Sequence, residues 1–223
     1  MILEKKNKES MSKADYSKKI ERVIEILKDR HVRMKRGMSD EQIEQVELMY
    51  GITFPEDLRA LYQAIVPVGK SFYDWTDQSP ENVWYINSMI ENPLRLSLLD
   101  IEHNKWLWMP EWGERPDSFD KRRSIAIKGL RSAPKVIPIY GKSFLPAFPN
   151  EAGNPVFDFF QWCESHCHGE NLWLYFEREW ARKKLSSLKT IDYTRLKKIP
   201  HWYEAIQGGG IPVYDWRPEL DVI

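Results

Sequence analysis

The sequence has little of what stabilises secreted or membrane-embedded proteins. Two of its 223 residues are cysteines, Cys163 and Cys167, which is too few for a disulfide framework. Every apolar run is shorter than the roughly 18 residues that a transmembrane helix needs, and the polar, lysine-rich residues 1–9 lack the apolar core of a signal peptide. We therefore expect a cytoplasmic protein without membrane contacts.

Sequence signatures of catalysis are also absent. The chain has no nucleophile-elbow pattern, no zincin helix and no dinucleotide fingerprint. Gly141-Lys142-Ser143 is similar to part of a phosphate loop, but the residue five positions before Gly141 is Val136 instead of the required glycine. These absences lower the prior for an enzyme without excluding one.

The composition favours a folded chain with its own apolar core. Hydrophobic residues make up 42% of the sequence, and a chain of this length buries about 70% of its unfolded surface. The 33 basic and 33 acidic residues cancel, but unevenly along the chain. Residues 1–37 hold 12 basic and 6 acidic residues, a net +6, whereas residues 38–117 hold 5 and 15, a net −10. Either these regions compensate each other within one fold, or an acidic surface meets a basic partner.

Helical signals dominate the N-terminal part. Apolar residues at 3.6-residue spacing predict a helix over residues 14–36, with basic residues gathered at its C-terminal end. Ser39 and Gln42 form a capping-box pattern at the start of a second helix, which Gly51 ends. Pro55 is well suited to begin a third helix.

After Pro67 the helical spacing gives way to mixed signals. Residues 74–77 predict a loop, and the Val-Trp-Tyr-Ile run at residues 83–86 predicts a strand. Further along, residues 119–130 and the apolar face around residues 172–180 predict helices.

Two apolar runs, residues 136–140 and 156–160, predict strands on either side of a segment rich in proline, glycine and asparagine. Pro138 cannot donate a ladder hydrogen bond, so the first strand should lie at an edge or contain a bulge. Together with the helices, these strands predict an α+β fold.

Short motifs follow one another between Met38 and Ile206. Residues 38–62 contain a Ser-Asp-Glu helix cap, a Gly-Ile-Thr-Phe-Pro corner and Glu-Asp-Leu at the next helix start, and residues 100–116 add Glu-His-Asn and Trp-Gly-Glu-Arg-Pro. Later segments read Ile-Pro-Ile-Tyr-Gly, Gly-Asn-Pro-Val-Phe and a closing Ile-Pro-His-Trp. In this order the chain resembles the SUKH superfamily, founded on yeast regulators of cell-wall assembly and killer-toxin resistance, and in particular its bacterial immunity-protein branch.

The resemblance implies a single domain in which N-terminal and C-terminal helices flank a largely antiparallel sheet. We place this domain at residues 14–207, between a flexible tail of residues 1–13 and a tail of residues 208–223 hinged on glycines. The chain departs from the branch at residues 142–144, which read Lys-Ser-Phe where relatives carry His-Arg-Tyr, and at residues 162–169. The residues that carry the structural motifs are Phe54, Pro55, Pro138, Tyr140, Gly141, Gly153, Asn154 and Pro155.

For function, the resemblance implies a non-catalytic protein without a cofactor, which binds and neutralises a cognate toxin domain. The net −10 region fits a basic target such as a nuclease, because carboxylates can imitate nucleic-acid phosphates. Direct nucleic-acid binding is disfavoured, since the charges around Trp106, Trp108 and Trp112 are mainly acidic. The expected contact residues are Asp74, Trp75, Asp77, Glu102, Trp108, Glu111, Trp112 and Glu114.

Two alternatives belong to other classes. An intracellular adaptor would bind endogenous partners, as the eukaryotic relatives imply. A small hydrolase or metal-binding protein would rest on Glu102-His103 or on a cysteine and histidine cluster. As neighbours on a strand, Glu102 and His103 would face opposite ways, and adjacent Cys167 and His168 are awkward ligands for one tetrahedral ion. The sequence therefore predicts no metal site at the cluster, which consists of Cys163, His166, Cys167 and His168.

Overall fold

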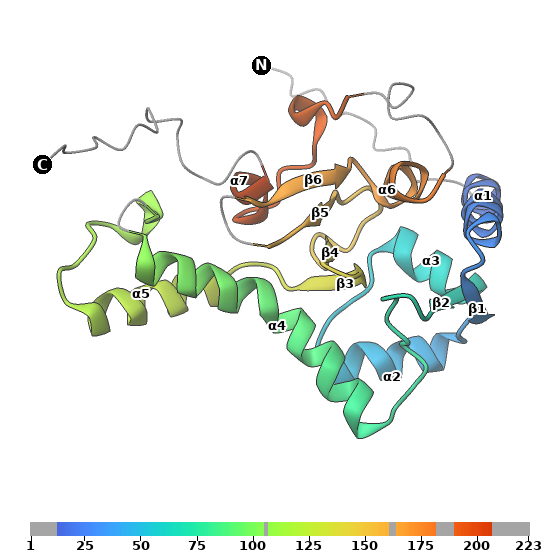
Figure 1. Cartoon of the computed structure of the whole chain (residues 1–223), viewed down its shortest axis with the longest axis horizontal. Coiled ribbons are helices and arrows are strands. Elements are labelled where there is room, and N and C mark those ends of the chain that lie inside the picture. Colours follow the sequence, from blue (N-terminus) through green and yellow to red (C-terminus); the bar gives the residue numbers. More distant parts are fainter. Residues whose placement is uncertain (1–12, 105–106, 161–163, 182–189, 207–223) are drawn as a thin grey trace, which may run out of the picture.

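The structure is a computed structural model that describes residues 13–104, 107–160, 164–181 and 190–206. It contains helices and two antiparallel sheets, one of order β1-β2 and one of order β3-β4-β5-β6 (Figure 1). The predicted α+β class is thus confirmed. Within the described ranges, none of the helices combines the length and apolar character needed to cross a membrane. Nearly all of the predicted N-terminal tail, and the whole of the C-terminal one, lie outside the described residues.

The N-terminal part follows the predicted helices except at one point. The capping box of Ser39 and Gln42 is present, and Gly51 ends that helix in the left-handed conformation. The predicted helix over residues 14–36 is wrong in its last third, because the chain turns at His31, whose φ is 54°, and then pairs as a strand with residues 65–68. The elements are α1 (Lys13–Asp29), β1 (Arg33–Arg36), α2 (Asp40–Tyr50), α3 (Glu56–Ala64) and β2 (Ile65–Val68).

The strand predicted at residues 83–86 is wrong, because this segment lies in α4 (Pro80–His103). The β-branched and aromatic run is overridden by apolar residues that recur at helical spacing and pack inward. Pro93 lies inside the helix and is buried, and the Ser97 hydroxyl donates to its carbonyl at 2.8 Å. The buried stripe of α4 consists of Ile86, Ile90, Pro93, Ser97 and Ile101.

The larger sheet contains both predicted strands and two further strands. Val136–Tyr140 forms β3 and Val156–Asp158 forms β5, while β4 (Ser143–Pro146) and β6 (His166–Gly169) complete the antiparallel order. As expected for Pro138, β3 is an edge strand with a register shift beside that residue.

This sheet separates two apolar cores. Ile137 and Leu145 face the first core, which includes residues of α1, α2, α3 and α6. Val136 and Phe144 face the second core, which includes residues of α5 and α7. The helices predicted near residues 119–130 and 172–180 are confirmed. The remaining elements are η1 (Pro110–Trp112), α5 (Phe119–Arg131), α6 (Leu172–Glu179), η4 (Tyr193–Arg195) and α7 (Trp202–Ile206).

A buried carboxylate joins two of the sequence motifs. Asp57, in the first turn of α3, is fully buried and accepts hydrogen bonds from the backbone N–H groups of Gly153 at 2.8 Å and Leu58 at 3.0 Å. Next to it, the buried amide of Asn154 donates to the carbonyls of Pro146 and Pro149, both at 2.9 Å. The Glu-Asp-Leu and Gly-Asn-Pro motifs, far apart in sequence, therefore form one packed corner.

Candidate functional site

The predicted acidic and aromatic contact residues do not form one surface. Trp75 is 1% exposed, and its indole N–H donates to the Tyr62 hydroxyl at 3.0 Å, so its assignment as a contact residue is wrong. Asp74 and Asp77 lie before the start of α4. The other predicted residues lie at or beyond the end of α4, namely Glu102, Trp108, Glu111, Trp112 and Glu114. Because α4 has 24 residues, its two ends lie about 35 Å apart.

At the first end, most of the predicted negative charge is already engaged. Asp74 forms an ion pair with Lys35 at 2.8 Å and accepts a hydrogen bond from the Thr76 hydroxyl at 2.7 Å. Asp77 is exposed, and its carboxylate accepts from the Ser79 backbone N–H at 2.9 Å. Of the two carboxylates, Asp77 is therefore the more accessible to a partner.

At the other end, the two described tryptophans pack against each other. The rings of Trp108 and Trp112 meet edge to face at 5.2 Å between centroids, and the Trp108 indole N–H donates to the Gly113 carbonyl at 2.7 Å. Trp106 lies outside the described residues. Glu102 forms an ion pair with Arg123 at 2.8 Å. Of the predicted carboxylates at this end, Glu111 and Glu114 are exposed.

The Glu102-His103 pair is not brought together for acid–base chemistry. Both residues lie at the end of α4 instead of on a strand. While Glu102 contacts Arg123, Nδ1 of His103 lies 2.7 Å from the carbonyl of Leu99. The two side chains therefore make separate structural contacts.

The sequence prediction missed an exposed stripe in the first half of α4. Trp84 is 71% exposed and Tyr85 is 43% exposed, and both lie opposite the buried stripe of the helix. Glu81, three residues before Trp84, and Glu91, seven residues after it, fall on the same face and are exposed. We call these four residues the α4 stripe. Glu81, Trp84 and Glu91 are spaced to share one face of a helix. The strand predicted at residues 83–86 does not place them on one face, so the sequence analysis missed the stripe.

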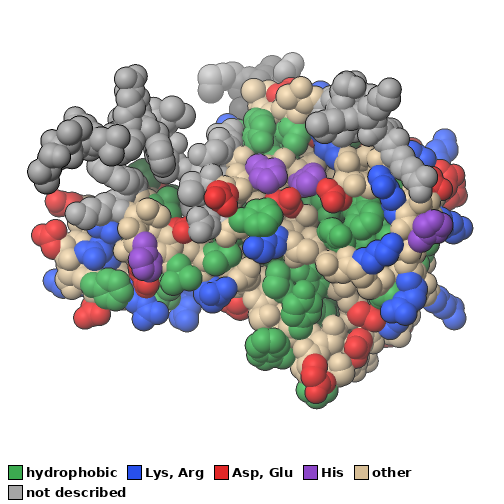
Figure 2. All heavy atoms as spheres, in the orientation of Figure 1, with side chains coloured by type: hydrophobic (Ala, Val, Ile, Leu, Met, Phe, Trp, Pro, Cys, Tyr) green, Lys and Arg blue, Asp and Glu red, His purple; other side chains and the backbone are tan. Residues whose placement is uncertain are grey.

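The surface around the α4 stripe combines apolar and acidic groups. Pro80, Glu81, Trp84 and Tyr85 line a shallow hollow. Figure 2 shows hydrophobic and acidic side chains beside one another at the lower tip of the molecule, where Figure 1 places the start of α4. The ring of Tyr85 stacks on that of Tyr73 with the centroids 5.5 Å apart, which holds one side of the hollow in place.

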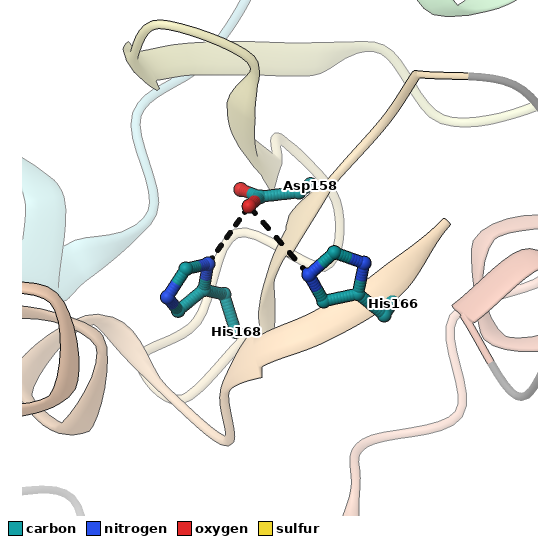
Figure 3. A group of neighbouring side chains, drawn as sticks. All are labelled: Asp158, His166 and His168. Carbon is teal, nitrogen blue, oxygen red and sulfur yellow. Dashed lines mark hydrogen bonds and ion pairs between the residues drawn. The ribbon is translucent and has the colours of Figure 1, made fainter. Parts of the chain in front are cut away.

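A second candidate site lies where β5 and β6 pair. Figure 3 shows Asp158 of β5 facing His166 and His168 of β6. The carboxylate Oδ2 of Asp158 lies 2.8 Å from Nδ1 of His168 and 3.7 Å from Nε2 of His166. The strand register explains the grouping, because Asp158 pairs with His166, and residues two positions apart on a strand share a face. Figure 2 shows two histidines together on this face, flanked by acidic side chains.

Neighbouring groups orient the atoms of this site. Nε2 of His168 contacts Glu179 of α6 at 2.9 Å, and the His168 ring lies edge to face against Tyr175. The Ser143 hydroxyl of β4 donates to the other oxygen of Asp158, Oδ1. Four elements thus converge on one histidine and one carboxylate.

The electrostatics of the site follow from these contacts. Hydrogen bonds to Asp158 and Glu179 raise the pKa of His168 to about 9, although burial opposes the shift. Burial would raise the pKa of Asp158, but hydrogen bonds from His168 and Ser143 outweigh it and lower that pKa. At neutral pH the pair therefore forms a charged link between β6, β5 and α6.

The cysteines take no part in this group. Cys167 points to the opposite face of β6, into the second core, where burial raises the pKa of its thiol to about 12. Its sulfur lies 3.7 Å from the Val156 carbonyl. Cys163 lies outside the described residues. The predicted four-residue cysteine and histidine cluster is therefore divided, and Asp158, which the sequence analysis missed, stands beside its histidines.

Comparison with protein families, with curated proteins and with solved structures gives no match.

Proposed function

We propose that this chain is a protein-binding domain of the immunity type, which recognises a basic partner through the α4 stripe. The observation that carries the proposal is the exposure of Trp84, 71% of which faces solvent on a helix whose opposite face is buried. Tryptophan is usually largely buried, and its large apolar surface becomes a strong anchor when a partner covers it.

Charge around Trp84 favours a basic partner. Glu81 and Glu91 flank the indole along the same exposed face of α4, and Asp77 lies just before the helix. Among the described residues, neither Glu81 nor Glu91 forms an ion pair with a cationic side chain. Such carboxylates steer a positively charged protein toward the anchor and add specificity more than affinity.

The resemblance to the SUKH superfamily supports a toxin domain as that partner. The packed corner of Asp57 and Gly153 joins two of the motifs on which the resemblance rests, as motifs of one scaffold would. A toxin that cleaves nucleic acid has a basic active site, and the carboxylates of the α4 stripe would stand in for phosphates there.

The test is protection of cells by co-expression with the product of a toxin gene next to the gene for this chain, together with binding of the two purified proteins. Trp84→Ala should weaken binding by about 2 kcal/mol, roughly 30-fold, as expected for an aromatic anchor. Glu81→Lys should slow association and make it less sensitive to salt.

Glu114→Lys is the matched control, because it makes the same charge reversal at the other end of α4. It should leave both binding and protection unchanged. If Trp84→Ala keeps full affinity and Glu114→Lys loses binding, the interface lies at the other end of α4. That result would overturn the proposed surface. Absence of protection by the wild-type chain would overturn the immunity function itself.

A further inference from the structure

We propose that Asp158, His166 and His168 form a binding site for a divalent transition metal ion, with zinc as the best fit. The proposal is independent of the α4 stripe, which lies on another part of the fold. It rests on the geometry of the three side chains, on the partners of their remaining polar atoms and on the charge balance of the group.

The ligand atoms are spaced as a small ion requires. Asp158, His166 and His168 each offer one ligand atom, and these three atoms lie within 4.8 Å of one another. In a tetrahedral zinc site with bonds of about 2.0–2.1 Å, ligand atoms are about 3.3 Å apart. The observed separations of 2.8 and 3.7 Å from the carboxylate lie on either side of that value. Changes of about half an ångström would bring these two separations to the spacing of a tetrahedral zinc site.

The atoms that would not bind the metal are already occupied. The other nitrogen of His168 contacts Glu179 at 2.9 Å, and the other oxygen of Asp158 accepts from Ser143. For His166, Nδ1 faces the carbonyl of Glu164 at 3.3 Å, which leaves Nε2 directed at the site. Metal-binding histidines usually donate their second N–H to a carboxylate or carbonyl in this way. With the ion bound, these contacts would hold the proton of each ring on the nitrogen that faces away from the metal.

An ion pair alone accounts for only part of this group. A charged His168 between Asp158 and Glu179 would stabilise the fold without a second histidine. His166 has a side chain 54% exposed and stands 3.7 Å from Asp158, so it adds little as an ion-pair partner in water. As a third ligand, in contrast, it completes the set, and a divalent ion with neutral imidazoles balances the charges of Asp158 and Glu179.

The ligand types and the exposure of the site define its chemistry. Two imidazole nitrogens and one carboxylate favour zinc and similar transition metals over magnesium or calcium, which prefer oxygen ligands throughout. Three protein ligands also leave a fourth position, and the exposed side of His166 opens it to solvent. A water molecule can take that position, as in zinc sites that are not purely structural.

The experiment is a zinc titration against a competing chelator, using the full chain purified without a polyhistidine tag and stripped of metal. We expect one zinc per chain and a higher unfolding temperature with zinc. His166→Ala should lower the affinity at least about 100-fold, more than the roughly 10–100-fold expected for Glu179→Gln. His103→Ala removes an exposed histidine elsewhere and should change nothing.

His166→Ala is the decisive variant, because His166 is exposed and its loss should leave the metal-free unfolding temperature unchanged. The proposal is overturned if the wild type binds less than one zinc per chain at saturation. It is also overturned if His166→Ala and His168→Asn both keep wild-type affinity, or if magnesium binds as tightly as zinc. None of these outcomes depends on whether the chain recognises a toxin.

Discussion

Replacing Asp57 by alanine tests whether the corner between α3 and the Gly-Asn-Pro loop holds the fold together. The variant removes both oxygen acceptors and leaves the backbone N–H groups of Gly153 and Leu58 without them. Asp57 is fully buried, so water cannot replace the carboxylate unless the corner opens. The effect should therefore appear as a loss of global stability.

The size of the loss follows from two opposing contributions. Each hydrogen bond to a charged group contributes about 1.5–3 kcal/mol, so two of them contribute about 3–6 kcal/mol. Burial raises the pKa of Asp57, which means that the buried carboxylate itself is unfavourable, and its removal recovers part of the loss. We expect Asp57→Ala to lower the free energy of unfolding by about 2–4 kcal/mol, or the unfolding temperature by about 5–15 °C.

Urea unfolding followed by tryptophan fluorescence measures this change, since Trp75 lies in the same core as Phe54 and Tyr62. Glu56→Ala is the matched control, because Glu56 is the exposed carboxylate next to Asp57 in the same helical turn. The control should change stability by about 0.5 kcal/mol or less. A loss below 1 kcal/mol for Asp57→Ala would refute the reasoning, since the corner would then tolerate two unpaired backbone donors.

Three further predictions concern other parts of the molecule. Gly169→Ala would place a Cβ atom 2.5 Å from the backbone nitrogen of Tyr175, and the displacement of α6 from β6 should cost about 1–3 kcal/mol in urea unfolding. Burial lowers the pKa of His201 to about 4, so folding favours the neutral imidazole. The free energy of unfolding should therefore be highest above about pH 6.5 and fall as the pH drops toward 4, by at most about 3 kcal/mol. His201→Asn, which tolerates the positive φ of this position, should lose correspondingly less stability between pH 6.5 and 4. Trp84→Ala should change stability by about 0.5 kcal/mol or less, because an exposed indole contributes little to the core, and a larger loss would show that the residue has a structural role.

Local signals in the sequence predicted the elements that have clear ends. The capping box at Ser39, the glycine at the end of α2 and the strand with Pro138 at a sheet edge are all present in the structure. The failures come from tertiary context. Arg33–Arg36 becomes a strand because β2 offers it a partner, although its charged residues read as a helix end. In α4, packing of Ile86 and Ile90 into the first core outweighs the strand preference of their neighbours.

The candidate sites show the same limit. His166 and His168 are visible in the sequence as residues two positions apart, which share a face once the segment is a strand. Nothing local to them indicates Asp158, because its position depends on the register between β5 and β6. The α4 stripe was missed for a simpler reason, since Trp84 aligns with Glu81 and Glu91 only on a helix.

The order of strands in the larger sheet also determines which strands can separate without unfolding the rest of the domain. Both faces of β4 are covered, by the first core through Leu145 and by the second through Phe144, so its amide protons should exchange with solvent only when the whole domain unfolds. β6 is an edge strand and can separate from β5 in a smaller, local event. The contact between Asp158 and His168 crosses this pair of strands, and its main effect is therefore on how often the edge of the sheet opens.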